Sequence, residues 1–125
     1  MICAYKKYIQ ALTFCFVLAF QFACESVKRE PLDISSLPDE VSLTEHIIPV
    51  FAEKCIKCHN GTTPPNLTVD NAYIDLTAGG YINLDTPEDS RLYEAINTGG
   101  NMQQYASDLD RALIFKWISQ GAYEN

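Results

Sequence analysis

The chain has 125 residues, enough for one domain of ordinary size, and its 16 acidic and 9 basic residues give a net charge of −7. This acidic balance excludes a nucleic-acid-binding surface, because such a surface needs a stripe of basic side chains. It favours partner proteins with basic docking surfaces instead.

Residues 1–24 have the features of an export signal. Lys6 and Lys7 form a basic start, and residues 12–22 form an apolar run that only two polar residues interrupt. A membrane span needs about 20 apolar residues, so this shorter run predicts a signal peptide that is removed from the mature protein. Without the two lysines, the rest of the chain has 16 acidic and 7 basic residues and a net charge of −9.

The predicted signal ends at Cys24, which follows a small residue, Ala23. This pair resembles the lipobox of bacterial lipoproteins, in which the cysteine is acylated and becomes the N-terminus. The resemblance implies lipidation of Cys24, a membrane anchor, and a periplasm-facing lipoprotein in the cell envelope of a Gram-negative type of bacterium. Gln21 and Phe22 depart from the usual lipobox, so cleavage without a lipid and an uncleaved anchor remain alternatives.

The rest of the chain divides into a tether and one domain. Residues 25–41 combine alternating charges with two prolines and little apolar content, so we expect a flexible tether there. Residues 42–125 are expected to form the domain. Ser42-Leu43-Thr44-Glu45 has the form of a capping box and predicts the start of its first helix. Pro49 follows, either as a kink in this helix or as the first-turn proline of a later start.

Cys55-Ile56-Lys57-Cys58-His59 is the strongest motif of the chain. Two thiols three residues apart can bond the two vinyl groups on one edge of a porphyrin, and the histidine that follows can bind the iron as proximal ligand. The motif therefore predicts one covalently attached haem c, with Cys55 and Cys58 as the attachment sites and His59 as an iron ligand. Two alternatives are less favoured. A redox dithiol usually follows a strand, and no strand pattern precedes this motif; a zinc site needs a second pair of ligands, which this sequence lacks.

Met102 is the candidate for the second axial ligand. It is the only methionine after the first residue, and it follows Gly99-Gly100 in a polar loop. The glycines allow the backbone to approach a flat ligand closely, and a thioether bound to iron explains a methionine in such a loop. His46 is the alternative, but it lies on the same helical segment as Cys55 and reaches the opposite face of a haem with difficulty. An open or weakly ligated iron is the third possibility.

Further helical patterns follow the motif, and no strand alternation competes with them. Phe51 shares a helical face with Cys55 and is expected beside the haem. Pro64-Pro65 turns the chain after the motif, and a proline carbonyl there is a candidate acceptor for the imidazole proton of the proximal histidine. We expect short helices over 71–76 and 91–96, the second capped by Ser90.

The last predicted helix begins at Ser107-Asp108 and stops at Gly121, with acidic residues at its positive end. Leu109, Leu113 and Trp117 share one of its faces. The predicted fold class is therefore all-α.

The sequence resembles the class I cytochromes c, and it is similar to the planctomycete-type cytochrome c domains of bacterial lipoproteins, often of Bacteroidetes. The matching segments are Ile48-Pro49-Val50-Phe51, Cys55 to His59, Asn71-Ala72-Tyr73, Gly79-Gly80-Tyr81, Pro87 to Tyr93, Met102, Trp117-Ile118 and Gly121-Ala122.

The resemblance implies a class I cytochrome c fold, with three to four helices wrapped around one covalently attached haem. It also implies ligation of the iron by His59 and Met102, and packing of Phe51 and Trp117 at the haem where the first and last helices cross. The chain departs from the family at Gln103, because the family usually has a proline directly after the methionine.

These features predict a monohaem c-type cytochrome that transfers single electrons in the cell envelope and is an electron carrier rather than a catalyst. The alternative is a haem-based sensor or small-ligand-binding cytochrome, which needs a displaceable sixth ligand. A peroxidase is not favoured, because no distal His–Arg pair is visible. Tyr73, Tyr81 and Arg91 either contact the haem propionates or belong to the core or surface.

Overall fold

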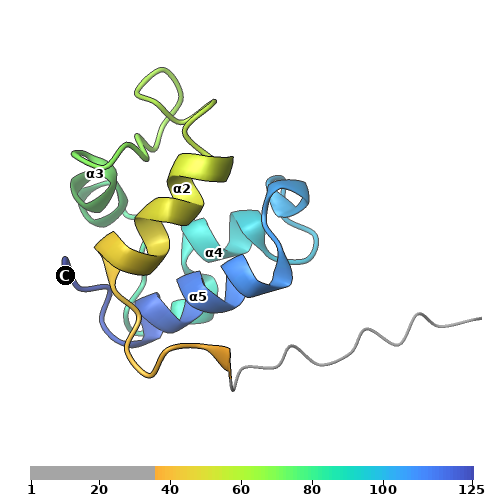
Figure 1. Cartoon of the computed structure of the whole chain (residues 1–125). Helices are drawn as coiled ribbons and strands as arrows, with labels where there is room; N and C mark the ends of the chain where they lie inside the picture. The colour runs from red at the N-terminus through yellow and green to blue at the C-terminus, as the bar shows by residue number, and fades with distance from the viewer. Residues whose placement is uncertain (1–35) are drawn as a thin grey trace, which may run out of the picture. The chain divides into compact units, whose positions relative to one another are not determined.

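The computed structural model describes residues 36–125 (Figure 1). The predicted signal peptide, Cys24 and most of the predicted tether lie outside the described residues. Within 36–125 the structure contains four α-helices and no strand, so the predicted all-α class is confirmed for this part of the chain. No helix in the same range has the length and apolar character to cross a membrane. The four helices are α2 (Ile48–Lys54), α3 (Ala72–Ala78), α4 (Arg91–Ile96) and α5 (Asp108–Ser119).

A π-helical turn, η3 (Leu43–Ile47), leads into α2. Ser42 caps it as predicted, because its Oγ accepts the backbone N–H of Glu45 over 3.3 Å. Pro49 lies in the first turn of α2, where backbone N–H groups have no partner within the helix, so its missing N–H costs no hydrogen bond. It therefore serves as the start of a helix and not as a kink within one. The His46 ring is part of the same cap, since its Nδ1 accepts the backbone N–H of Ser42 over 3.0 Å.

The two short middle helices form where the sequence predicted them. Helix α3 extends two residues beyond its predicted end, and α4 covers residues 91–96. Ser90 is the N-cap residue of α4 as predicted, and its carbonyl accepts the N–H of Glu94 over 2.8 Å. Its side chain makes no cap hydrogen bond, however. The buried Oγ accepts the backbone N–H of Asn83 over 2.9 Å and donates to the carbonyl of the same residue, so it closes the preceding loop.

Helix α5 begins at a complete capping box between Ser107 and Asp110 and is followed by Gly121, whose φ of +110° suits glycine. Its buried face differs from the predicted one. Leu109 is 46 % exposed, whereas Asp110, Ile114 and Trp117 are buried. The carboxylate of Asp110 turns inward to bond the helix start, and the buried residues then follow it at intervals of four and three.

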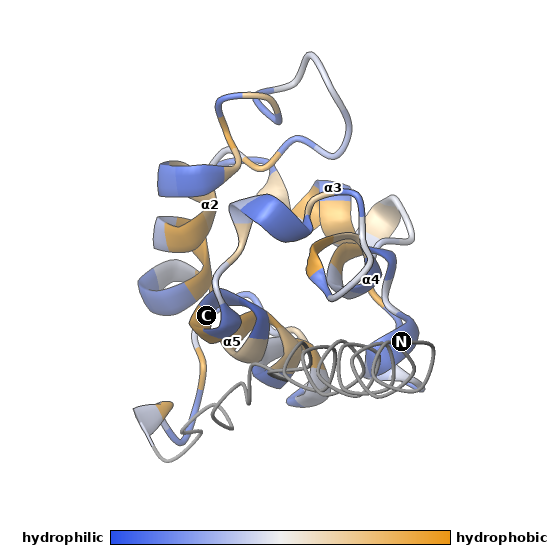
Figure 2. Ribbon diagram, turned by 90° about the vertical axis from the view of Figure 1, so that its right-hand side faces the viewer, coloured by the Kyte–Doolittle hydropathy of each residue, from blue (hydrophilic) through white to orange (hydrophobic). Residues whose placement is uncertain are grey.

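One hydrophobic core joins all four helices. Figure 1 shows α4 and α5 side by side, and Tyr93 of α4 meets Phe115 of α5 with ring centroids 4.9 Å apart. Figure 2 shows the apolar side of α2 turned toward the other helices. The most deeply buried side chains include Ile47, Phe51, Leu76, Ile114, Trp117 and Ile118.

The domain begins before residue 42, the boundary that the sequence suggested. Val41 is only 2 % exposed and belongs to the core. Lys116 donates to the carbonyl of Pro38 over 2.7 Å, and Gln120 donates to that of Asp39 over 2.7 Å. The last residues of the expected tether are therefore bound to Lys116 of α5 and to Gln120 directly after it, because these side chains donate to their backbone carbonyls.

Candidate functional site

A cavity of about 670 Å³ opens between the end of α2, helix α4 and the loop that follows α4. Its volume is within the range of about 300–1,000 Å³ that is usual for ligand and cofactor pockets. The structure brings five of the predicted site residues to its walls. They are Phe51, Cys55, Cys58, His59 and Met102.

Cys55 and Cys58 are free thiols that lie one turn apart at the cavity wall. The Cys55 carbonyl accepts the N–H of Cys58 over 3.1 Å and that of His59 over 3.0 Å, so the backbone stays helical in form beyond the end of α2. Cys55 is partly buried, whereas Cys58 is exposed. Burial raises the pKa of the Cys55 thiol, and the carboxylate of Asp110 adds to the increase, so this thiol is protonated at neutral pH.

The ring of His59 is fixed by two backbone carbonyls in the loop that follows it. Its Nδ1 lies 3.1 Å from the oxygen of Pro65 and 3.2 Å from the oxygen of Thr63. Carbonyl oxygens only accept hydrogen bonds, so Nδ1 carries a proton, and in the neutral ring the lone pair is then on Nε2. The expected contact with a proline carbonyl is therefore present, and the ring is in the tautomer that binds a metal through Nε2.

The loop itself is held on the motif. The carbonyl of His59 accepts the N–H of Leu67 over 2.8 Å, and the peptide bond between Pro64 and Pro65 is cis. Leu67 is buried and lines the cavity together with both prolines. The acceptors of the imidazole proton thus belong to a segment that is bonded to the backbone of His59 through Leu67, a residue of the core.

Met102 reaches the cavity from the loop between α4 and α5. Its N–H donates to the carbonyl of Ala95 over 2.7 Å. Gly100 makes this approach possible, since a Cβ at that position would lie 2.2 Å from the carbonyl oxygen of Glu94. Met102 is partly buried against the core rather than exposed in the loop. The close approach at Gly100 is to the backbone of α4, and the approach of the glycines to a flat ligand stays a prediction.

The sequence did not predict an ion pair that lies beside the Cys55–His59 motif. Nζ of Lys54 lies 2.5 Å from Oδ2 of Asp110, and that oxygen also accepts the backbone N–H and the hydroxyl of Ser107 over 2.6 and 2.7 Å. The bond to Asp110 raises the pKa of Lys54. Burial alone would raise the pKa of Asp110, but the bonds from Lys54 and Ser107 outweigh it and hold this pKa below its usual value. The pair joins the residue before Cys55 to the start of α5.

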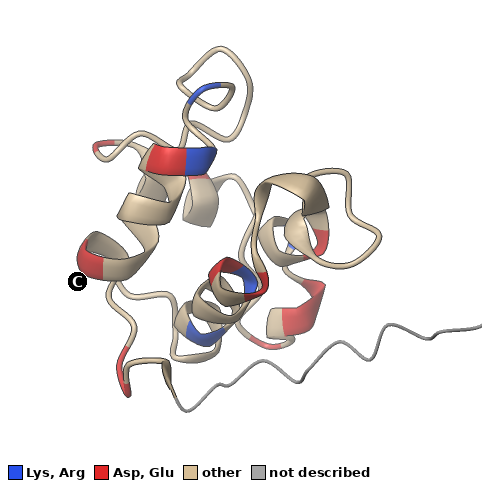
Figure 3. Ribbon diagram, turned by 45° about the vertical axis from the view of Figure 1, so that its right-hand side comes forward, with Lys and Arg blue, Asp and Glu red and all other residues tan. Residues whose placement is uncertain are grey.

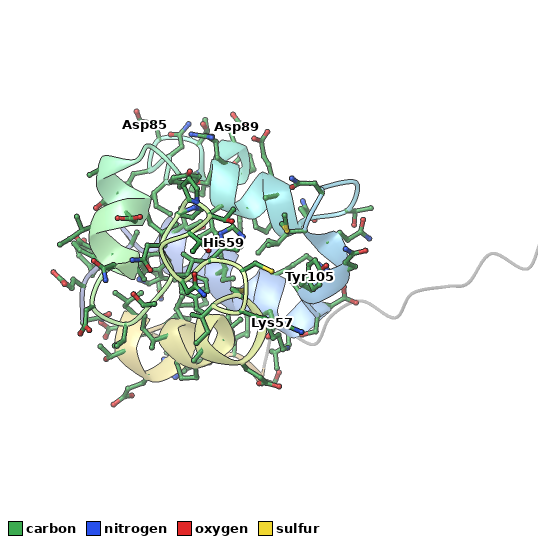
Figure 4. All side chains as sticks on the ribbon, turned by 90° about the horizontal axis from the view of Figure 1, so that it is seen from above. Lys57, His59, Asp85, Asp89 and Tyr105 are labelled. Carbon is green, nitrogen blue, oxygen red and sulfur yellow. The ribbon has the colours of Figure 1, made fainter. Side chains whose placement is uncertain are left out.

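Charged groups are few at the cavity, although acidic residues are spread over α2, α5 and the loops (Figure 3). The Arg91 guanidinium lies 4.5 Å from the centre of the Tyr81 ring, and both side chains line the cavity. Tyr73 is not part of the wall. Asp85 and Asp89 lie at the edge of the molecule in Figure 4, away from the cavity wall.

Trp117 does not line the cavity, although the resemblance places it at the haem. It is 1 % exposed and packs in the core, where its indole N–H donates to the carbonyl of Tyr123 over 3.0 Å. His46 is also absent from the wall, whereas Met102 is part of it. No group of three His, Cys, Asp or Glu side chains is arranged to hold a metal ion among residues 36–125.

Comparison of the chain with protein-family models, with curated proteins and with solved structures finds no match.

Proposed function

We propose that this chain is a monohaem c-type cytochrome of class I fold that transfers single electrons. One observation carries the proposal. The Nδ1–H of His59 is bonded to the Pro65 carbonyl, and this leaves the basic Nε2 of a cavity-lining imidazole next to two free thiols. A ligating histidine in a metalloprotein usually has such a carbonyl or carboxylate partner on its other nitrogen.

The residues of the cavity fit a covalently held haem. Its wall is mainly apolar, and the thiols of Cys55 and Cys58 lie at one side of it. Each thiol would add its sulfur to one carbon of a vinyl group and its hydrogen to the other carbon. A thioether bond forms in this step, no atom leaves, and no oxidant is consumed.

Bound haem supplies an iron that alternates between Fe(II) and Fe(III), and the chain adjusts its surroundings. Met102 offers a neutral, soft thioether that favours the reduced state. The apolar side chains of Phe51 and Leu67 keep water from the site and disfavour the additional charge of the oxidised state. His59 is the proposed proximal ligand, and its carbonyl partner makes the ring a stronger donor.

The proposed setting is the cell envelope, with the domain anchored through a lipid on Cys24. The redox partners would be proteins with basic docking surfaces, since the chain carries a net charge of −7. Such partners would be guided to the acidic domain by long-range attraction that weakens as the salt concentration rises.

The attachment can be tested by producing the full chain in a host that matures c-type cytochromes. We expect one haem per chain that survives denaturation, seen as haem stain on a denaturing gel and as added mass. The variants Cys55→Ser and Cys58→Ser should each lose one thioether bond, and the double variant should lose the covalent haem. Lys57→Ser, between the two cysteines and exposed, is the matched control and should retain it.

Two outcomes would contradict the proposal. A folded wild-type chain without covalent haem would remove its basis. A haem that is attached but cannot be reduced and reoxidised reversibly by one electron would exclude the role in electron transfer.

A second function is favoured by one feature of the sequence. Met102 is followed by Gln103, so no proline restrains the backbone directly after the proposed ligand. A methionine that leaves the iron easily would create a site for small ligands and thus a haem-based sensor. The strength with which the loop holds Met102 separates the two functions.

A further inference from the structure

Arg111 of α5 holds the loop that carries Met102 at both of its ends. Its Nη1 lies 2.6 Å from the carbonyl oxygen of Ala106, which follows the loop, and 3.4 Å from that of Ile96, which precedes it. A third acceptor within the loop is the carbonyl of Gln103, also at 3.4 Å, so the two N–H groups of Nη1 are shared among three carbonyls. One guanidinium group thus spans the segment between Ile96 and Ala106.

The charge at the helix end does not favour Arg111 at its position, although its ion pair with Asp108, three residues earlier, supports the helix. Arg111 lies in the first turn of α5, where the partial positive charge of the helix end disfavours a cation. Its side chain is only 13 % exposed, so the charge is also largely removed from water. The ion pair with Asp108 and the three backbone carbonyls compensate for both costs.

The other contacts of the loop hold it to α4 and to itself. Met102 donates to Ala95 of α4, and the side chain of Gln103 accepts the N–H of Gly99 over 2.7 Å. Arg111 adds the bonds that join the loop to α5. Because its donors are charged and are held in a planar group, these bonds are stronger and more directional than those of a lysine would be.

We infer that Arg111 is a positioning residue that keeps Met102 at the cavity and so decides whether the sixth iron position is closed. The inference rests on the proposed function. In this chain the restraint that a proline after Met102 would provide comes from a side chain on another helix. The loop is then restrained by a tertiary contact with α5 rather than by the stiffness of its own backbone.

The test uses the haem-loaded full chain and imidazole as an external ligand. In Arg111→Met we expect the apparent affinity for imidazole to rise by roughly tenfold, because the fraction of molecules with an open sixth position rises. The far-red methionine–iron charge-transfer band of the ferric protein should weaken in parallel. Arg111→Lys retains the charge but loses the fork, so it should lie between this variant and the wild type.

Lys116→Met is the matched control. Lys116 is on the same helix and also donates to a backbone carbonyl, that of Pro38, but it lies outside the cavity wall. This variant should bind imidazole as the wild type does. Equal imidazole affinity in Arg111→Met and Lys116→Met would overturn the inference.

Amide hydrogen exchange over residues 97–106 separates a failure of this inference from a failure of the proposed function. We expect faster exchange in Arg111→Met than in Lys116→Met, together with the change in imidazole affinity. Faster exchange without any bound haem would leave Arg111 as a loop anchor and would overturn its role toward Met102. A wild-type chain that has haem and a methionine band, but shows no response to Arg111→Met, would overturn the inference alone.

Discussion

The carbonyl oxygen of Pro65 lies 3.1 Å from Nδ1 of His59 and determines which nitrogen of the ring is free. A proline carbonyl is well suited to this position. Proline has no backbone N–H that needs a partner, and the segment that carries Pro65 is bound to the motif through Leu67. The chemistry of the site thus depends on a backbone acceptor six residues after the ligand, and no side-chain substitution removes it.

Substitution of His59 tests this assignment directly. His59→Ala removes the only imidazole that lines the cavity, and we expect the amount of mature holoprotein to fall by at least about tenfold. The measurement is the haem absorbance per folded chain. His46→Ala is the control, because His46 is the other histidine and takes part only in the helix cap. Equal loss of haem in both variants would contradict the assignment.

Gly100 should be intolerant of any side chain. In Gly100→Ala the new Cβ would meet the carbonyl of Glu94 at 2.2 Å, so the loop must move away from α4 and take Met102 with it. We expect a loss of about 1–3 kcal/mol in the free energy of unfolding and a weaker methionine–iron band.

Gly80→Ala is the comparison for Gly100→Ala. Gly80 has a positive φ of +68°, which Gly100 does not, but a Cβ at Gly80 meets nothing within 4 Å. Gly80→Ala should lower the free energy of unfolding by about 1–2 kcal/mol and leave the haem spectrum unchanged. If both variants retain the methionine band, the loop does not depend on the contact at Gly100.

The pair of Lys54 and Asp110 predicts a dependence of stability on acid pH. The pKa of Asp110 is lower in the folded protein than its unfolded value of about 3.9, so its contribution to stability is present above that pH. It is lost as the pH falls through the folded pKa. Asp110→Asn should therefore be less stable by about 2–3 kcal/mol at neutral pH, since it leaves Lys54 partly buried and unpaired.

Urea unfolding at a series of pH values measures this effect. The stability of Asp110→Asn should change less than that of the wild type as the pH falls below about 4, because the titrating group has been removed. Asp70→Asn is the control, since Asp70 is exposed, and its pH profile should follow the wild type. Parallel profiles for wild type and Asp110→Asn would show that the pair adds nothing.

The elements that the sequence predicts well are those with local signals. The capping residues Ser42 and Ser107, the short helices and the turn at Pro64-Pro65 depend on neighbours within a few positions. The cavity also contains the predicted Phe51 and Met102. Local patterns therefore give most of the helices and most of the residues at the candidate site.

The remaining features depend on pairs that are distant in the sequence or on backbone atoms. Lys54 and Asp110 are 56 positions apart, and the acceptors of Arg111 are carbonyl groups, which every residue has. The predicted buried face of α5 was wrong at Leu109, because a pattern of leucines cannot show that Asp110 turns inward. Trp117 is equally compatible with a cofactor wall and with the core until the packing of the other helices is known.

Met102 offers the prediction that distinguishes an electron carrier from a sensor. In the wild type, Gly100 and the Ala95 carbonyl hold the loop against α4 and Arg111 joins it to α5, so we expect the thioether to stay on the iron. The ferric protein should then show the far-red methionine band, and the ferrous protein should bind carbon monoxide slowly.

Met102→Ala should abolish the band and accelerate carbon monoxide binding by roughly a hundredfold or more, if the closed state is favoured by about 3 kcal/mol. Met102→His is a useful second variant, because a strong replacement ligand should restore slow binding without restoring the band. Rapid carbon monoxide binding by the wild type itself, equal to that of Met102→Ala, would mean that the loop does not keep the iron closed. That result would favour the haem-based sensor over the electron carrier. Both functions use the same attachment by Cys55 and Cys58, and they differ only in whether the sixth iron position is closed.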